Sequence, residues 1–128
     1  MKQAATLALV SLAGFALGAG AIQGLHAQAT KTAPAYAVAE IEVTDPPAYQ
    51  AYLGKAIESL KPYNAHIITR AKPVAKEGPA PQGNVVITRF DSLADAEKWY
   101  STPPYKDLIA ERQKAAKGRF YIIEGVPQ

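Results

Sequence analysis

The 128-residue sequence contains no cysteine, which excludes both disulfide bonds and the lipid-modified leader of a lipoprotein. Small secreted domains commonly depend on disulfides, so without them this chain must be stabilised by its core or by association. We therefore expect a homodimer. Histidine is nearly as scarce, with two residues in the chain, of which only His66 lies outside the N-terminal segment. A lone histidine without neighbouring carboxylates is typical of a strand residue, so we predict no metal site.

A strong charge of either sign is also absent, because the formal net charge is only +3. The cations are scattered, and their densest group, residues 112–119, is typical of a helix end, where Lys and Arg complement the helix dipole. This pattern disfavours a nucleic-acid or membrane partner. Gly78 and Gly83 lie in a proline-rich turn and lack the strand-to-helix context of a phosphate loop. No Ser-His-Asp order is found, and we predict no cofactor.

The one long apolar run, residues 4–22, follows Lys2 and precedes a small-x-small motif that ends at Ala29. This pattern predicts a cleaved secretory signal peptide over residues 1–29 and a periplasmic or secreted mature protein. The alternative is an uncleaved membrane anchor, since the run approaches the roughly 20 residues that span a bilayer. The glycines within the run and the good cleavage motif favour cleavage, which leaves a mature chain without membrane contact.

After a linker over residues 30–35, the pattern predicts one small α+β domain over residues 36–126. Alternating or short apolar runs bounded by turn residues predict four strands, with an extension of the second to Lys76 left open. Pro73 places this second strand at a sheet edge, because proline cannot donate to a neighbouring strand. The predicted strands cover residues 36–43, 65–71, 84–90 and 119–125.

Capping signals precede two predicted helices. Thr44 or Asp45 can accept a backbone N–H ahead of a Pro-Pro pair, and apolar residues then recur at helical spacing until Pro62 ends or kinks the helix. Ser92 with Asp95 resembles a capping box and opens the next helix.

The second of these helices is predicted to be broken by the Pro-Pro pair at residues 103–104. Each proline removes a backbone donor and clashes with the preceding turn, so the helix must stop near Ser101. A further helix then starts at once, with Ser101 or Thr102 as cap, and runs toward Lys117. Gly118 is predicted to stop it.

The order strand, helix, strand, strand, broken helix, strand predicts a ferredoxin-like βαββαβ fold. Its antiparallel sheet has the helices on one face and the strand order four-one-three-two. The other face is then uncovered, or it must be covered by something else.

Strand parity predicts what this uncovered face holds. Apolar walls with a few convergent polar groups are typical of a small-ligand site. Arg70 is our candidate for binding a carboxylate, and Glu40 or His66 for moving a proton as the catalytic group. The aromatic rings of Trp99, Tyr100 and Tyr105 are candidates for the wall of the entrance. If the strand sets align, this face carries Glu40, His66 and Arg70 with Phe120 and Ile122 of the last strand, while the facing of Arg89 and the inclusion of Glu124 stay open.

The same residues also have purely structural explanations. Glu40 and Arg70 can pair across a solvated sheet or an interface, where such pairs are worth little. Trp99 and Tyr100 share helical spacing with Ala96, which favours a core or interface position over a ligand wall. A one-residue register slip would turn Glu40 or Arg70 toward the helices.

Four motifs are distinctive: Val-Thr-Asp-Pro at 43–46, Phe-x-Ser at 90–92, Trp-Tyr-x-x-Pro-x-Tyr at 99–105 and Glu-Gly at 124–125. Together they resemble the domain-of-unknown-function family 1330, of the dimeric α/β-barrel superfamily, over about residues 36–126. The resemblance implies a homodimer in which two sheets face each other as a barrel, with Trp99, Tyr100 and Tyr105 near its open end or the dimer contact. No established catalytic residues come with it.

Three functions are consistent with this sequence. The leading hypothesis is a secreted homodimer that binds a small organic molecule between its facing sheets. The enzyme alternative is a cofactor-independent oxygenase, isomerase or lyase that uses Glu40, His66 or Arg70. The third is a structural or interaction protein whose barrel is filled by its own side chains.

Overall fold

The computed structural model describes residues 32–128, so the predicted signal peptide lies outside the described residues. One antiparallel sheet has the order β2-β3-β1-β4, which confirms the predicted arrangement. Within residues 32–128 no helix has the length and apolar character needed to cross a membrane. The elements are β1 (Ala35–Val43), α2 (Pro46–Leu60), the 3-10 turn η1 (Lys61–Tyr63), β2 (His66–Ala71), β3 (Asn84–Phe90), α3 (Leu93–Ser101), α4 (Tyr105–Ala115) and β4 (Ala116–Glu124).

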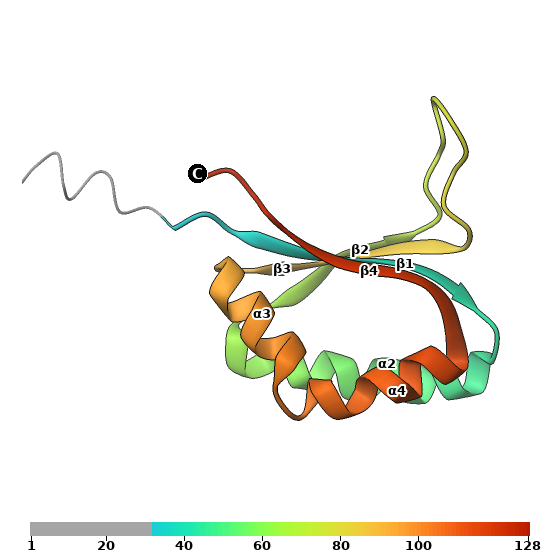
Figure 1. The fold of residues 1–128 in the computed structure, drawn as a ribbon, viewed down its shortest axis with the longest axis horizontal. Helices are drawn as coiled ribbons and strands as arrows, with labels where there is room; N and C mark the ends of the chain where they lie inside the picture. Colours follow the sequence, from blue (N-terminus) through green and yellow to red (C-terminus); the bar gives the residue numbers. More distant parts are fainter. Residues whose placement is uncertain (1–31) are drawn as a thin grey trace, which may run out of the picture. The chain divides into compact units, whose positions relative to one another are not determined.

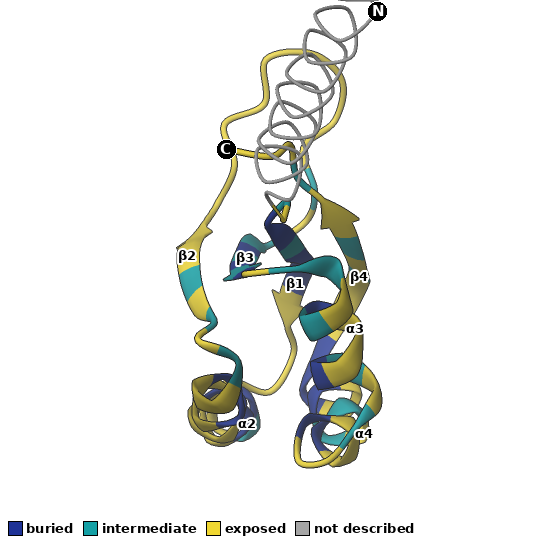
Figure 2. Cartoon of the chain, turned by 90° about the vertical axis from the view of Figure 1, so that its left-hand side faces the viewer, coloured by how far each residue is buried: buried dark blue, intermediate teal, exposed yellow. Residues whose placement is uncertain are grey.

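All three α-helices cover the same face of the sheet, while the loop between β2 and β3 extends on the opposite side (Figure 1). Figure 2 shows α2 below the β2 side of the sheet and α3 and α4 below the β4 side, with burial concentrated in β1. The helix face of β1 carries small or aliphatic side chains, which let the helices approach closely. The protein therefore has the α+β, ferredoxin-like fold that the element order predicts. These β1 core residues are Ala35, Ala37, Ala39 and Ile41.

The caps predicted for α2 and α3 are present, whereas the Ser101 or Thr102 cap predicted for the next helix is wrong, because α4 begins only at Tyr105 and no side chain caps it. The Asp45 side chain accepts a hydrogen bond from the Ala48 backbone N–H at 3.2 Å, and Ser92 Oγ accepts one from the Asp95 backbone N–H at 3.1 Å. Each cap satisfies a backbone donor that a helix start otherwise leaves without an intrahelical partner. Near Pro62, α2 ends at Leu60 and continues only as the η1 turn.

The boundaries around α4 and β2 differ from the prediction. The prolines lie outside α4, which begins only at Tyr105 and already ends at Ala115. Gly118 is therefore not a helix stop but part of β4, where its φ of +143° and the proximity of the Glu40 carbonyl leave no room for a Cβ atom. The extension of β2 toward Lys76 does not form, since the strand ends at Ala71.

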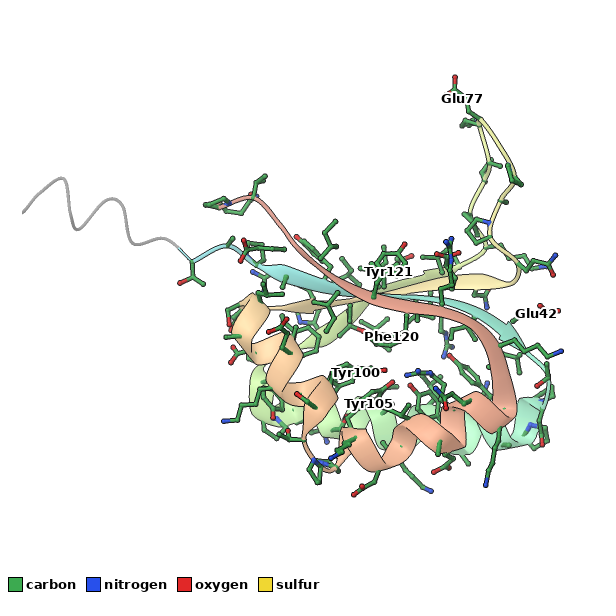
Figure 3. All side chains as sticks on the ribbon, in the orientation of Figure 1. Glu42, Glu77, Tyr100, Tyr105, Phe120 and Tyr121 are labelled. Carbon is green, nitrogen blue, oxygen red and sulfur yellow. The ribbon has the colours of Figure 1, made fainter. Side chains whose placement is uncertain are left out.

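The predicted facing of β4 is wrong. Phe120 pairs with Ala39 and Ile122 with Ala37, so both side chains face the helices, and Glu124 shares their parity. Figure 3 shows Phe120 on the helix side of the sheet and Tyr121 on the other. Because Phe120 to Ile123 are all apolar or aromatic, alternation within this strand does not distinguish its two faces. Only the pairing of β4 with β1 shows which side chains of β4 face the helices.

A β-bulge turns Arg70 away from the predicted face. Pairing with β3 shifts between Ile67 and Thr69, so that Thr69 lies opposite Ile87 and Arg70 lies opposite Val86. Val86 is in the core between sheet and helices. An extra residue in one strand reverses the parity of every residue beyond it, so Arg70 shares the helix face and not the face of Glu40.

Candidate functional site

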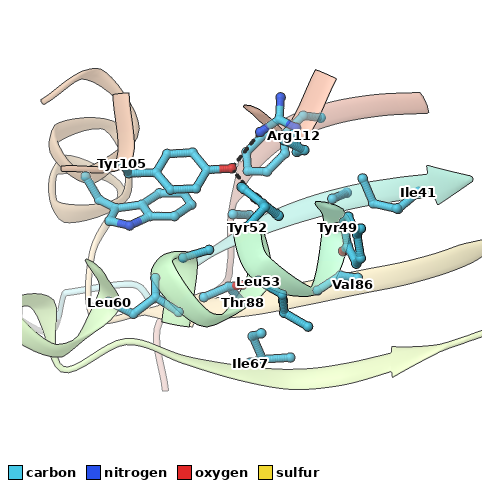
Figure 4. Close-up of a pocket in the computed structure, with 15 residues that line it drawn as sticks. Ile41, Tyr49, Tyr52, Leu53, Leu60, Ile67, Val86, Thr88, Tyr105 and Arg112 are labelled. Atoms are coloured by element: carbon cyan, nitrogen blue, oxygen red, sulfur yellow. Dashed lines mark hydrogen bonds between the residues drawn. The ribbon is translucent and has the colours of Figure 1, made fainter. Parts of the chain in front are cut away.

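A cavity of about 40 Å³, here called the inner cavity, lies between the sheet and the helices α2 and α4. It has room for about two water molecules. Most of its wall is aliphatic or aromatic, and its polar side chains come from α2, α3, α4 and β3 (Figure 4). The polar or aromatic residues that line it are Tyr49, Tyr52, Thr88, Trp99, Tyr105, Arg112 and Phe120.

Three polar side chains form a continuous cluster in the wall of the inner cavity. The hydroxyls of Tyr52 and Tyr105 are hydrogen-bonded at 2.7 Å, and Arg112 Nη1 donates to Tyr105 Oη at 2.6 Å. Figure 4 shows both bonds meeting at the Tyr105 hydroxyl. Tyr105 and Arg112 are seven residues apart on α4 and so lie on one side of that helix. We call these three residues the Tyr-Tyr-Arg cluster.

The break between α3 and α4 positions the aromatic part of the wall. Trp99 lies in the last turn of α3 and Tyr105 is the first residue of α4, and their rings stack with centroids 3.7 Å apart. Trp99 Nε1 donates to Ser59 Oγ at 2.9 Å, which ties α3 to α2. The proline break therefore lets two aromatic residues of nearby sequence pack face to face, which one continuous helix would not permit.

Arg112 is a buried cation with neutral neighbours. The residue is 7 % exposed, and its guanidinium lies 4.6 Å from the centre of the Phe120 ring. The other groups around it are tyrosine hydroxyls, and none of the salt bridges within residues 32–128 includes it. A buried charge is costly unless it is paired, so Arg112 is the residue of this cavity with the clearest need for a partner.

Burial also raises the pKa of both tyrosine hydroxyls of the cluster. Desolvation raises the pKa of the Tyr52 hydroxyl well above its ordinary value, and the neighbouring Tyr105 raises it further. Desolvation likewise raises the pKa of Tyr105, although Arg112 acts in the opposite direction. Both hydroxyls therefore stay protonated at neutral pH and are able to donate hydrogen bonds.

Two larger pockets adjoin the inner cavity. The apolar outer pocket, of about 260 Å³, lies between the start of α2 and the end of β2 and shares Ile41, Tyr49 and Val86 with the inner cavity. Arg70 is at this pocket. The polar outer pocket, of about 230 Å³, lies between α4 and β4 and shares Arg112 with the inner cavity. The polar outer pocket thus reaches Arg112 of the Tyr-Tyr-Arg cluster directly, whereas the apolar outer pocket adjoins the inner cavity through residues outside the cluster.

The opposite face of the sheet carries an apolar surface. A shallow hollow of about 410 Å³ is lined only by aromatic and aliphatic side chains of all four strands. The neighbouring Tyr121 is 45 % exposed, which is high for a large aromatic side chain. We call this surface the open face. The residues lining its hollow are Tyr36, Val38, Ile68, Ile87 and Ile123.

The structure separates the predicted site residues. Glu40 lies on the open face, buried beneath Arg119, whose Nη2 is 2.8 Å from its carboxylate. His66 is exposed on β2 opposite Arg89, on the same face, whereas Arg70 lies on the helix face. Glu40 and Arg70 therefore form no pair, and the predicted group of Glu40, His66 and Arg70 does not converge.

The predicted aromatic residues lie on the helix side of the sheet. Trp99 and Tyr105 are buried in the core and line the inner cavity, and Tyr100 lines the polar outer pocket. They are thus remote from the open face, where a barrel interior between two sheets would be. No set of three or more metal-binding side chains occurs within residues 32–128.

Sequence reasoning missed Arg112 as a site residue because its cationic neighbours suggested an exposed helix end. A usable signal was present: Arg112 lies seven residues after Tyr105, at helical spacing, and four after the buried Leu108. Tyr52 lies at an apolar position of the first predicted helix, where its sequence indicates only core packing, since a hydroxyl at such a position is ordinary in a core. Its partner Tyr105 is 53 residues away in sequence.

Comparison with solved structures supports the fold. A protein of unknown function from Rhodopseudomonas palustris is 15 % identical, with a TM-score of 0.60 over 84 % of this chain and 93 % of that one. SnoaB, a cofactor-independent oxygenase from Streptomyces nogalater, is 5 % identical, with a TM-score of 0.51 over 76 % of this chain and 97 % of that one. At such identities the likeness shows the fold alone.

No curated protein matches the chain. The family described as a domain of unknown function, DUF1330, matches residues 34–126. This range includes all four strands of the sheet and the helices that pack against it. The chain therefore belongs to the DUF1330 family.

Proposed function

We propose that this protein binds a small organic molecule in the apolar outer pocket, with the polar end of that molecule directed toward the inner cavity. The observation that carries the proposal is the Tyr-Tyr-Arg cluster, which places a buried cation and hydroxyl groups in the wall of the inner cavity, next to the wall that this cavity shares with the apolar outer pocket. A volume of about 260 Å³ is close to the lower end of ordinary ligand pockets, about 300 Å³, and suits a compound of one or two rings.

The open face is the surface that we assign to a homodimer. Its apolar side chains include Ile68 and Ile123, which are 50 % and 56 % exposed in the single chain. A second copy of the sheet would cover them and form the barrel that the resemblance implies. This assignment moves the ligand from the space between two sheets, where the sequence hypothesis placed it, to a pocket within each subunit.

We also infer that residues 1–29 direct export and are removed. Purification of the protein from the periplasm or medium, followed by N-terminal sequencing, should show a chain that begins at Thr30. A chain recovered intact from the membrane fraction would contradict this inference.

Catalysis is the second candidate function. Tyr52 and Tyr105 hold hydroxyl protons next to a fixed positive charge, an arrangement that can stabilise negative charge developing on a substrate oxygen. The fold is shared with a cofactor-independent oxygenase, which makes reaction with the bound compound the first activity to assay. Turnover that is lost in Tyr105→Phe while binding persists would support an enzyme.

The proposed pocket is tested by comparing two adjacent residues of β1. Ala39 lines the inner cavity, whereas its neighbour Val38 lines the hollow of the open face. Ligand-observed NMR with a panel of neutral and acidic one-ring and two-ring aromatic compounds should identify binders to the purified protein. We expect Ala39→Leu, which fills the cavity, to lose these binders and Val38→Leu to retain them.

The reverse result, with binding lost only in Val38→Leu, would place the ligand between facing sheets and contradict the proposed pocket. Absence of any binder from the panel would favour the structural or interaction function. Circular dichroism of both variants controls for folding, and Ala56→Leu, which enters the same cavity from α2, provides a second filling variant.

A further inference from the structure

We infer that the ligand of this pocket is an oxyanion, a carboxylate or phenolate on an apolar ring, bound through Arg112 and one tyrosine hydroxyl. The inference rests on the proposed function and specifies its ligand class. It follows from the hydrogen-bond donors and charges around the inner cavity.

The hydrogen-bond count leaves one tyrosine hydroxyl hydrogen unused. A guanidinium only donates, so the Tyr105 oxygen accepts from Arg112. The bond between Tyr52 and Tyr105 uses one of the two hydroxyl hydrogens, whichever residue donates. The contact between Arg112 and the Tyr52 hydroxyl also has the guanidinium as its donor, so it uses no hydroxyl hydrogen. The other hydrogen therefore remains available to a ligand.

The charges of the residues around the inner cavity also favour an anionic ligand. Arg112 is the only charged residue among those that line the inner cavity, and no Asp or Glu accompanies it there. Its neighbours are the hydroxyls of Tyr52, Tyr100 and Tyr105 and the Phe120 ring, and none of them is an Asp or Glu side chain. A site with surplus donors and an uncompensated cation selects a ligand that brings acceptors and a negative charge.

A ligand can also reach the Arg112 guanidinium through the polar outer pocket. Arg112 forms part of the wall that the inner cavity shares with the polar outer pocket, whose lining includes Gln113 and Lys117 but no acidic residue. The apolar outer pocket accommodates the rest of the molecule, because most of its exposed lining is aliphatic or aromatic and its charged residue, Arg70, is a cation. Together these surroundings fit an apolar ring that carries one oxyanion.

The test uses 4-nitrophenol and its neutral analogue 4-nitroanisole as probes of the whole protein. The phenolate form of 4-nitrophenol absorbs at longer wavelength than the phenol, so its ionisation is read directly. We expect binding at least about tenfold tighter than that of 4-nitroanisole, as one charge-assisted hydrogen bond provides. Binding should also shift the absorption toward the phenolate, whereas a merely apolar pocket would shift it toward the phenol.

Arg112→Met should weaken 4-nitrophenol binding by about tenfold or more and abolish the spectral shift, while Tyr52→Phe should weaken binding by a smaller factor. The matched control is Lys55→Met, which removes the same charge from an exposed ion pair with Glu111 on the outer side of the helices. It should leave both readouts unchanged. The pair benzoate and benzamide repeats the comparison on the unmodified protein and distinguishes a carboxylate from a phenolate site.

Equal binding of charged and neutral probes, or a shift of bound 4-nitrophenol toward the phenol, would overturn the oxyanion inference and leave the proposed pocket intact. Failure of both charged probes to bind would also overturn it. Failure of the whole aromatic panel in the NMR experiment would instead overturn the proposed function. If Arg112→Met does not fold, the two probe pairs on the unmodified protein decide the question.

Discussion

Tyr105 shows how one residue joins the core to the candidate site. Its side chain is fully buried, its ring stacks on Trp99, and its hydroxyl meets Tyr52 and Arg112. The ring contributes to stability through apolar burial, while the hydroxyl contributes to the polar cluster. Core and ligand-wall explanations of these aromatic residues are thus compatible, because the cavity lies inside the core.

At the residue scale, Trp99→Ala should lower the free energy of unfolding by about 3–5 kcal/mol, the usual cost of a large cavity. The indole is 4 % exposed and holds α3 to α2 through Ser59. Urea denaturation measures the change. Ile57→Ala on α2, where the side chain is 44 % exposed, is the control and should change stability by about 0.5 kcal/mol or less. An equally small loss for Trp99→Ala would mean that the indole lines an open mouth.

The buried hydroxyl of Tyr52 should make stability fall in alkaline solution. Desolvation raises the pKa of this group in the folded protein above its ordinary value of 10.0, so the unfolded chain releases the proton first. Stability is therefore fully present below about pH 10 and declines as the pH rises above it. Denaturation curves at increasing pH should show a weaker decline in Tyr52→Phe. An unchanged decline would show that the hydroxyl ionises as freely in the folded protein as in the unfolded chain.

At the element scale, β2 and β4 show where sequence patterns stop being informative. In β2 the bulge between Ile67 and Thr69 is not marked by glycine or proline, and it reverses the facing of Arg70. In β4 the run from Phe120 to Ile123 has no polar member to mark a solvent face. By contrast β3, whose core-facing Val86, Thr88 and Phe90 alternate with more exposed residues, has the bounds that the sequence predicts.

Two glycines, one inside β4 and one inside α2, test the local backbone geometry with the same substitution. Gly118→Ala should lower the free energy of unfolding by more than about 1 kcal/mol, because φ is +143° and the new Cβ would collide with the Glu40 carbonyl of β1. Gly54→Ala, within α2 and with nothing within 4 Å of its Cβ position, should raise it by about 0.5–1 kcal/mol. Urea denaturation compares the two, and a neutral Gly118→Ala would argue against the close approach of β4 to β1.

At the scale of the whole molecule, the sheet has two different apolar faces. One is covered by the helices and contains the inner cavity, and the other is the open face. Soluble monomers rarely leave a large contiguous apolar patch exposed, so the open face supports the homodimer that we propose. A two-fold dimer is the simplest closed arrangement that covers it.

Ile123→Asp and Ile68→Asp should each convert a dimer to a monomer, because each would place a carboxylate within the covered apolar face. Sedimentation velocity measures the assembly state. The control is Ile57→Asp, on the exposed side of α2, which should remain dimeric. Dimers that persist in both open-face variants but dissociate in the control would place the interface on the helices.

The amino-acid sequence by itself determined the element order, the strand order and the caps of α2 and α3, because periodicity, proline and side-chain hydrogen bonding act over a few residues. It also placed the break before Tyr105, since two adjacent prolines exclude a helix in any surroundings. The family motifs led to the same fold and to DUF1330.

Only the tertiary structure decided which residues form the candidate site. Arg112 and Tyr52 meet at Tyr105 although the two tyrosines are 53 residues apart, and Arg70 leaves the open face through a bulge that pairing with β3 reveals. Such convergence depends on register and on packing between elements, and a single-residue shift reverses which face a strand residue occupies. Local sequence preferences do not contain that information, because it resides in the contacts between distant segments.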